Sequence, residues 1–223
     1  MKRSGQAKKP VSKKFASLIE QLQRKRGVRD LPKRVLIVCE DDKSAPRYFE
    51  AIKKHYGLSA ASVQVVGSGH SSQPLQVVRK AIEIKTEAAH PESGTEPFGY
   101  VWCVIDGDYG EKIANARHKA EAKGVELAIS TKCFEYWLLL HFEESASLTH
   151  NCDQTVVSLK KHITDYDKGS SDFSKIVGHA REASRRAEEL RKPGIARKEL
   201  PENHNPCSEI YRLVNDLLPE PGS

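Results

Sequence analysis

Two short acidic clusters in this chain each follow directly on an apolar run, a position in which carboxylates are suited to metal chemistry. Glu40 comes immediately after the run Arg34–Cys39, and Asp106 and Asp108 come after the run Tyr100–Ile105. Each run has the length and the β-branched or aromatic content of a buried parallel strand. Ligands of open α/β sheets bind beyond the carboxyl ends of the strands, so we expect the three carboxylates to lie together there. Because like charges repel one another, a divalent cation is the simplest partner for them.

The motif Asp106-Gly107-Asp108 has a spacing and a ligand type that suit Mg²⁺ or Mn²⁺. In an extended segment, residues i and i+2 point to the same side, and Mg²⁺ prefers oxygen ligands in octahedral geometry. Gly107 would let the backbone turn tightly or approach a phosphate closely. The same tripeptide is also a common surface turn, and an acid such as Glu40 can also cap a helix. The metal interpretation therefore depends on the two strand ends being neighbours.

Three further acidic or basic residues are candidates for supporting roles at this site. Asp42 is a candidate ligand of a second metal ion, and Lys43 is either a phosphate contact or a solvated lysine. Glu135 lies in the first turn of an apolar helix expected at Cys133–Phe142. There it either complements the helix dipole or serves as a metal ligand or general base. His141 lies on a different face of that helix and is expected to be structural.

Alternating strand-like and helix-like segments supply the elements that would position these residues. The pattern predicts an α/β fold with a parallel, doubly wound sheet and helices on both faces. The expected strands are Arg34–Cys39, Ser62–Val66, Tyr100–Ile105 and Val125–Ile129, and the expected helices are Val11–Arg26, Ser44–His55, Gln73–Ala89, Lys112–Lys123, Cys133–Phe142, Thr155–Ile163, Ile176–Leu190 and Cys207–Leu218. We expect three parts: a basic, partly helical N-terminal arm (1–32), a catalytic domain (33–150) and a helical C-terminal lobe (151–223).

The composition indicates a soluble globular protein with a basic end. Of the 223 residues, 38% are hydrophobic and 30% are charged. No apolar run approaches the roughly 20 residues that a membrane-spanning helix needs, so no membrane partner is expected. Residues 1–34 hold 12 of the 36 Lys and Arg residues and only two acids, so the net charge of +6 belongs to the arm. Such an arm either contacts phosphates without sequence preference or is a solvated leader.

The cysteines and the first ten residues indicate the cellular compartment in which we expect the protein. The five cysteines are scattered and odd in number, which favours buried thiols in a reducing cytoplasm over a disulfide scaffold or a zinc site. Residues 1–10 lack the apolar stretch of a secretory signal. We therefore expect a cytoplasmic protein, with its oligomeric state left open.

Three blocks of the sequence resemble the signature blocks of the RloB-like family. They are residues 34–49 (RVLIVCEDDKSAPRYF), 102–108 (WCVIDGD) and 129–143 (ISTKCFEYWLLLHFE). The resemblance implies a Toprim-like fold and Mg²⁺-dependent cleavage of DNA or RNA in antiviral defence, often beside a separate ATPase subunit. In the first block the chain has Asp42 and Ala45 where family members commonly have Glu. In the third it has Ser-Thr-Lys before Cys-Phe-Glu, where they commonly have Ser-Asn-Pro.

We therefore expect a Mg²⁺-dependent nuclease acting on DNA or RNA, with transfer RNA among the candidate substrates. Glu40, Asp106 and Asp108 would bind the metal, and Lys43 and Glu135 would contribute to catalysis. One alternative is a catalytically inactive nucleic-acid-binding or regulatory subunit of a defence complex. Another is an enzyme acting on nucleotides or small phosphates, which a deep, enclosed pocket would favour and an open groove would not.

Overall fold

The computed structural model describes residues 34–69, 73–144 and 151–218 of the 223-residue chain. Contacts divide the chain into two units, residues 1–33 and residues 34–223, and the fold described below is that of the second. The helix expected at Val11–Arg26 lies outside the described residues.

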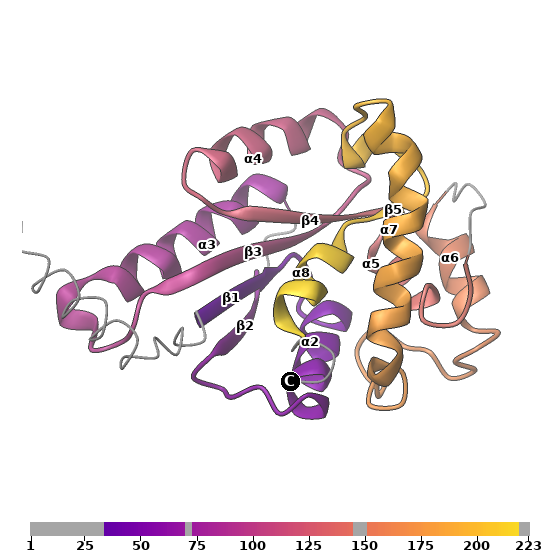
Figure 1. Ribbon diagram of the computed structural model, residues 1–223, viewed down its shortest axis with the longest axis horizontal. Helices are drawn as coiled ribbons and strands as arrows, with labels where there is room; N and C mark the ends of the chain where they lie inside the picture. The colour runs from indigo at the N-terminus through magenta and orange to yellow at the C-terminus, as the bar shows by residue number, and fades with distance from the viewer. Residues whose placement is uncertain (1–33, 70–72, 145–150, 219–223) are drawn as a thin grey trace, which may run out of the picture. The chain divides into compact units, whose positions relative to one another are not determined.

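A five-stranded sheet in the order β2-β1-β3-β4-β5 forms the centre of the fold (Figure 1). Strands β1 to β4 are mutually parallel, and β5 is antiparallel to β4. The strands span Arg34–Cys39 (β1), Val63–Gly67 (β2), Phe98–Asp106 (β3), Glu126–Thr131 (β4) and Cys207–Ser208 (β5). Because β2 lies on one side of β1 and β3 on the other, the chain changes direction between β1 and β3. That point is the topological switch at which open α/β sheets bind ligands.

Seven α-helices and three short 3-10 helices accompany the sheet within the described residues. The α-helices are α2 (Ser44–His55), α3 (Pro74–Ala89), α4 (Glu111–Glu121), α5 (Phe134–Leu139), α6 (Cys152–Leu159), α7 (Ala180–Ala196) and α8 (Ile210–Leu217), and the 3-10 helices are Pro91–Ser93, Val177–His179 and Pro201–Asn203. The predicted α/β class, with a mostly parallel sheet and a helical C-terminal part, is confirmed.

Both faces of the sheet are covered, which explains why β1 is apolar and buried from Val35 to Cys39. Along β1, Leu36 and Val38 pack in a cluster with residues of α3 and α4. Ile37 and Cys39, which point to the opposite face, pack in a larger cluster with residues of α2, α5, α7 and α8. A strand buried on both faces has no need of polar alternation. The C-terminal helices therefore share a core with the sheet.

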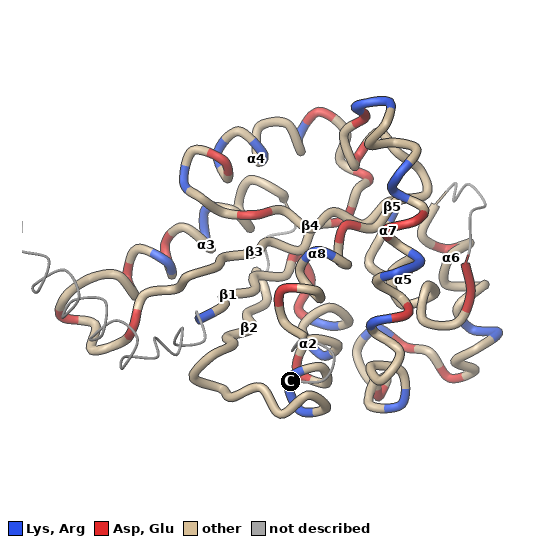
Figure 2. Tube along the Cα trace, viewed as in Figure 1, with Lys and Arg blue, Asp and Glu red and all other residues tan. Residues whose placement is uncertain are grey.

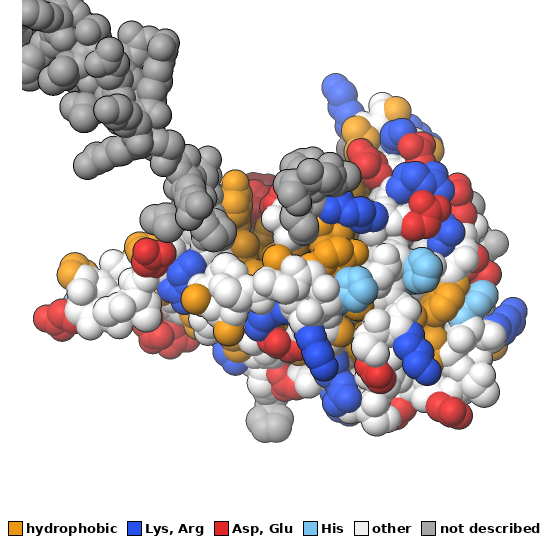
Figure 3. All heavy atoms as spheres, turned by 60° about the horizontal axis from the view of Figure 1, so that its bottom comes forward, with side chains coloured by type: hydrophobic (Ala, Val, Ile, Leu, Met, Phe, Trp, Pro, Cys, Tyr) orange, Lys and Arg blue, Asp and Glu red, His pale blue; other side chains and the backbone are white. Residues whose placement is uncertain are grey.

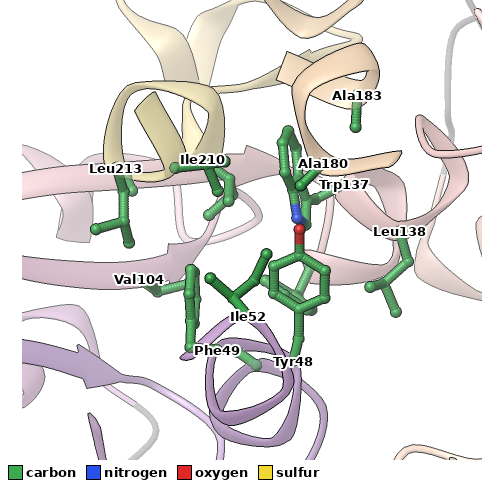
Figure 4. Close-up of a cluster of buried hydrophobic side chains, with 14 of the residues drawn as sticks. Tyr48, Phe49, Ile52, Val104, Trp137, Leu138, Ala180, Ala183, Ile210 and Leu213 are labelled. Carbon is green, nitrogen blue, oxygen red and sulfur yellow. The ribbon is translucent and has the colours of Figure 1, made fainter. Parts of the chain in front are cut away.

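An aromatic cluster joins α2 to α5 beneath this second face (Figure 4). The Tyr48 ring packs edge-on against Phe49 and Trp137, with ring centroids 5.3 and 6.1 Å apart. Every residue of α5 is buried. Such apolar and edge-to-face packing favours one orientation of the short helix. Because α5 carries Glu135, this packing also fixes where that carboxylate lies.

Several details of the structure differ from the sequence-based expectations, most of them at the ends of elements. Helix α5 begins at Phe134 and ends at Leu139, and is therefore shorter than the expected Cys133–Phe142. Strand β5 occupies Cys207 and Ser208, where the sequence predicts the start of a helix at Cys207–Leu218, and α8 begins only at Ile210. The prediction was wrong there because two residues carry no recognisable period. The expectation of free thiols only was wrong, because Cys133 and Cys152 form a disulfide, whereas the other three cysteines are free and buried. These two cysteines are far apart in sequence, and only the packing of α6 beside α5 brings them together.

Within the three described ranges, no helix is both long and apolar enough to cross a membrane.

Candidate active site

The ends of β1 and β3 bring Glu40 and Asp106 into direct contact. Glu40 follows the last residue of β1, and its backbone N–H continues the ladder by donating to Val104 O at 2.9 Å. Asp106 is the last residue of β3. Its backbone N–H donates to Glu40 Oε2 at 3.0 Å, and the Tyr109 hydroxyl donates to Glu40 Oε1. The two carboxylates therefore lie at the switch point of the sheet, as the sequence predicts.

Helix α5 adds a third carboxylate. Its first N–H, that of Phe134, donates to Asp106 Oδ1 at 2.9 Å. The next residue, Glu135, is fully buried and lies in the first turn of the helix. Its Oε1 accepts a hydrogen bond from the Tyr166 hydroxyl at 2.7 Å and forms an ion pair with Lys168 Nζ at 3.0 Å. Glu135 thus lies at the helix N-terminus and also lines the cavity together with the other acids, which fits both roles expected for it.

These side chains surround a small cavity of about 120 Å³. The charged residues around it are Glu40, Asp41, Lys43, Asp106, Glu135 and Lys168, and the others are Ser44, Ala45, Val104 and Phe134. Glu135 forms the buried end of the cavity, whereas Lys43 is exposed. The cavity thus combines four carboxylates with two ammonium groups.

Asp41 has a structural as well as an electrostatic part in the cavity. Its Oδ2 accepts hydrogen bonds from the N–H and the hydroxyl of Ser44, at 2.8 and 2.7 Å. Its Oδ1 accepts one from the Ala45 N–H at 3.2 Å. A carboxylate at this place satisfies the free N–H groups at the start of α2 and complements the helix dipole. The start of α2 is thereby held against the cavity.

The pKa of Glu40 is raised to about 7, first because the group is buried. The hydrogen bonds donated by Tyr109 and by the Asp106 N–H offset this only in part, and the carboxylates of Asp108 and Asp41 raise the pKa further. Burial and repulsion both disfavour the charged form. A cation in the cavity would relieve both effects.

Asp106 is perturbed in the same direction. Burial raises its pKa well above the usual value for an aspartate, and the nearby charges of Glu40 and Glu135 add to the effect. The ammonium group of Lys168 acts in the opposite direction. Strongly perturbed carboxylates that converge on one cavity are typical of functional sites.

The structure does not bring two of the predicted ligands to the cavity. Asp108 is exposed and does not line it, although it is close enough to act electrostatically on Glu40 and Asp106. Asp42 accepts a hydrogen bond from the Gly69 N–H at 3.0 Å, beyond the end of β2. A Cβ atom at Gly67 would come within 1.9 Å of Asp42 Oδ1, so the contact with this segment is close.

Four residues that contribute to the site were not predicted as site residues. Asp41 lies in the acidic run after β1, which was the only signal that pointed to it. Tyr109 follows the Asp-Gly-Asp motif and binds Glu40. Tyr166 and Lys168 belong to the segment between α6 and α7. Nothing in the sequence around them distinguishes them from the other residues of that segment.

Gly107 and His141 have structural roles beside the site. A Cβ atom at Gly107 would lie 3.0 Å from Thr131 Cα, so the turn packs against the end of β4. His141 is buried, its Nδ1 lies 3.1 Å from Trp137 O, and the Tyr48 hydroxyl lies 3.0 Å from its Nε2. Burial lowers its pKa to about 4. The prediction of a satisfied structural histidine is confirmed.

The donor set of the cavity fits a hard divalent cation. Its candidate ligands, the carboxylates of Glu40, Asp106, Glu135 and Asp41, are all oxygen donors, as Mg²⁺ and Mn²⁺ prefer. The hydrogen bonds to Glu40 and Asp106 use one lone pair of an oxygen and leave a second for a metal. Among the described residues, the one group of three possible ligands whose ligand atoms all lie within 4.8 Å of one another is Cys133, Glu135 and Cys152. It is not a metal site in this state because its two sulfurs form the disulfide. The four carboxylates line one cavity, and their oxygens would have to draw closer together to share an ion.

Fold and site together define an α/β protein with a carboxylate-lined cavity at the switch point of its sheet. The family model described as RloB-like protein matches residues 35–217. The chain therefore belongs to the RloB-like family, as its three sequence blocks indicate. No curated protein and no solved structure matches it.

Proposed function

We propose that this protein is a metal-dependent nuclease that hydrolyses phosphodiester bonds of DNA or RNA, with Mg²⁺ or Mn²⁺ as its cofactor. The observation that carries the proposal is the convergence of Glu40, Asp106 and Glu135 on one cavity at the switch point of the sheet. Membership of the RloB-like family supports it at a coarser level. We further propose a role in antiviral defence beside a separate ATPase subunit.

The residues of the cavity would divide the chemistry among themselves. Glu40, Asp106 and Asp41 would hold the cation, and Glu135 would bind it as well or orient the attacking water. A bound divalent ion supplies charge neutralisation at the phosphate and lowers the pKa of a coordinated water. Tyr109 would fix the direction of the Glu40 carboxylate through its hydrogen bond. The ammonium group of Lys43 at the cavity would attract the negatively charged polymer.

The size of the cavity favours a polymer over a free nucleotide. At about 120 Å³ it has room for an ion and a phosphate group. Pockets that enclose a drug-sized or nucleotide-sized molecule usually measure about 300–1,000 Å³. A nucleic acid could present one phosphodiester to the cavity while the rest of the chain remains outside.

The charge of the described surface contributes little to non-specific attraction. Blue and red segments alternate along α3, α4 and α7 (Figure 2), and the face in Figure 3 carries no continuous field of one sign. On α7, Glu182 pairs with Arg185 and Arg186, and Glu189 pairs with Lys192. The charged residues on the exposed side of α7 therefore largely neutralise one another.

One observation favours the alternative of an inactive binding or regulatory subunit. Asp42 is turned toward Gly69, and Ala45 lines the cavity without offering a ligand. If both of these residues were acids facing the cavity, they could bind a second metal ion. As the chain stands, a second ion would have fewer protein ligands. This alternative predicts nucleic-acid binding that is unaffected when Mg²⁺ is removed.

Cleavage of a mixed panel of plasmid DNA, single-stranded DNA and transfer RNA tests the proposal. Wild type and Asp106→Ala are compared with Mg²⁺, with Mn²⁺ and with a chelator at low salt. We expect cleavage by wild type alone and only with the metal, with at least about a hundredfold loss in the variant. Full activity of Asp106→Ala would contradict the proposal. Metal-independent binding without cleavage would favour the alternative.

A further inference from the structure

The segment Tyr166–Ser171 follows β4 by more than 30 residues, yet it supplies Lys168 to the lining of the cavity. Tyr166 is buried and donates its hydroxyl hydrogen to Glu135 Oε1 at 2.7 Å. Arg47 of α2 donates to the carbonyl oxygens of Gly169 and Ser170, at 2.8 and 3.3 Å. The segment is thus fastened to the core at one end and to α2 at the other.

Hydrogen bonds within the segment hold its turn in one form. Asp167 Oδ1 accepts hydrogen bonds from the Gly169 N–H and the Ser170 hydroxyl, both at 2.9 Å. The Asp167 N–H donates to Ser171 Oγ at 2.8 Å. An aspartate that bonds the backbone two residues on is a stable turn device. Lys168, in the middle of this turn, is therefore carried by a rigid support.

Among the residues that the structure describes, Lys168 is the only basic residue that forms an ion pair with a carboxylate of the cavity. Its Nζ lies 3.0 Å from Glu135 Oε1, and the charges of Asp106 and Asp41 also favour its charged form. Its side chain is 45% exposed, whereas Glu135 is fully buried. The ammonium group therefore lies between the buried acids and the solvent, where an incoming anion would meet it first.

We propose that Lys168 is the phosphate-binding residue of this site, and that its ion pair with Glu135 is the substrate-free arrangement. This inference rests on the proposed function. When a phosphodiester enters, one of its oxygens replaces Glu135 Oε1 as the partner of Lys168. Glu135 is then released to bind the metal or to orient water. The C-terminal part of the chain thus supplies a group that recognises substrate.

The inference makes Mg²⁺ affinity and nucleic-acid affinity respond in opposite directions to one substitution. An ammonium group among carboxylates repels a metal ion and attracts a phosphate. In Lys168→Met, Mg²⁺ should bind about three- to tenfold more tightly, because a competing charge is lost. Nucleic acid should bind about tenfold more weakly. A residue with a structural role alone would not separate the two affinities in this way.

Two binding measurements on the full chain test this. Calorimetry measures Mg²⁺ affinity, and fluorescence anisotropy with Ca²⁺ measures the affinity for a labelled single-stranded DNA 20-mer and for transfer RNA. Lys161→Met is the matched control, since it removes an exposed lysine that does not line the cavity and should leave both affinities within about twofold of wild type. Lys168→Arg should retain nucleic-acid binding.

Lys168→Met leaves the buried carboxylate of Glu135 without its counter-charge, so this single variant could fold poorly. The same substitution made in the Glu135→Gln variant keeps the test valid in that case. Glu135→Gln with Lys168→Met is then compared with Glu135→Gln alone, and the loss of nucleic-acid affinity should persist. Unchanged nucleic-acid affinity, weaker Mg²⁺ binding in Lys168→Met, or no binding of nucleic acid by wild type would each overturn the inference.

Failure of the inference and failure of the proposed function are distinguishable. If wild type cleaves nucleic acid and Lys168→Met cleaves equally well with unchanged affinity, the nuclease stands and Lys168 has another role. If wild type does not cleave but the two affinities move in opposite directions, Lys168 binds phosphate at a site that is not a nuclease.

Discussion

Glu40 and Asp106 are held together in the folded chain against their mutual repulsion. Both groups are partly buried, and both have pKa values above the ordinary range. In the unfolded chain each carboxylate would be separate and hydrated. The pair therefore lowers the stability of the metal-free protein at neutral pH, which is typical of a site selected for function.

Glu40→Gln should stabilise the metal-free protein at high pH. Because the folded-state pKa of Glu40, about 7, lies above the unfolded value of 4.5, ionisation destabilises the fold progressively as the pH rises through this window. With solvent screening of this partly exposed group, the variant should be more stable than wild type by about 1–2 kcal/mol at pH 8. Urea unfolding in the presence of a chelator measures the difference.

The gap between the two proteins should close near pH 4, where Glu40 is protonated in both states. Addition of Mg²⁺ at pH 8 should stabilise wild type by mass action and leave Glu40→Gln nearly unchanged. A variant that is less stable than wild type by the same amount at pH 4 and pH 8 would show that Glu40 is structural.

At the scale of single residues, the sequence predicts the acids on the strand ends better than the groups that surround them. Glu40 and Asp106 are found because an apolar run shows where a strand ends. Asp108 belongs to the same Asp-Gly-Asp motif as Asp106. Only the structure shows that the turn at Gly107 packs against β4 and that Asp108 is exposed. Lys168 is contributed by tertiary packing and has no local signal.

Among the elements, α5 and α6 are joined covalently beside the site. Cys133 immediately precedes α5, Cys152 is the first residue of α6, and the disulfide links them. Helix α5 carries Glu135, and the start of α6 lies beside it, since Glu135 Oε2 is 3.3 Å from Cys152 Sγ. The disulfide therefore limits how far α6 can move away from the cavity.

Reduction of this disulfide should destabilise the fold. The two cysteines are separated by 19 positions in sequence, and closing a loop of about this size in the unfolded chain contributes about 3 kcal/mol. For a unit of this size the melting temperature should fall by about 6–12 °C. Differential scanning calorimetry with and without a phosphine reductant measures this change.

The double variant Cys133→Ser, Cys152→Ser is the control for that experiment. It retains the three free cysteines, so its melting temperature should equal that of reduced wild type and should not respond to the reductant. Wild-type protein that melts at the same temperature with and without reductant would show that the disulfide does not contribute to the stability of the fold.

Element types are more predictable here than element ends and pairings. Strands β1 and β3 follow from long apolar runs, and α2, α3 and α4 follow from helical periodicity. Strand β5 does not, because its two residues are defined by their pairing with Ser130 and Thr131, which are more than 70 positions away in sequence. The disulfide is hidden for the same reason, since cysteine spacing alone does not determine connectivity.

At the scale of the whole molecule, the segments after residue 151 are part of the unit that forms the site. They supply α7 and α8 to the larger core and β5 to the sheet (Figure 1). They also supply Lys168 to the cavity and Tyr166 as a hydrogen-bond partner of Glu135. The strongest acidic motifs lie before residue 136, so the sequence alone would place the whole chemistry in the first part. The structure shows that Lys168, one of the two basic residues of the cavity, comes from the second part of the chain.

Calorimetric titration of Mg²⁺ into wild type, Asp106→Asn and Asp108→Asn tests the central claim most directly. The two substitutions remove the same charge two residues apart, but only Asp106 lines the cavity. The account predicts that wild type binds Mg²⁺, that Asp106→Asn loses at least about tenfold in affinity, and that Asp108→Asn stays within about threefold of wild type. Loss of binding in Asp108→Asn with retention in Asp106→Asn, or no binding by wild type, would contradict it.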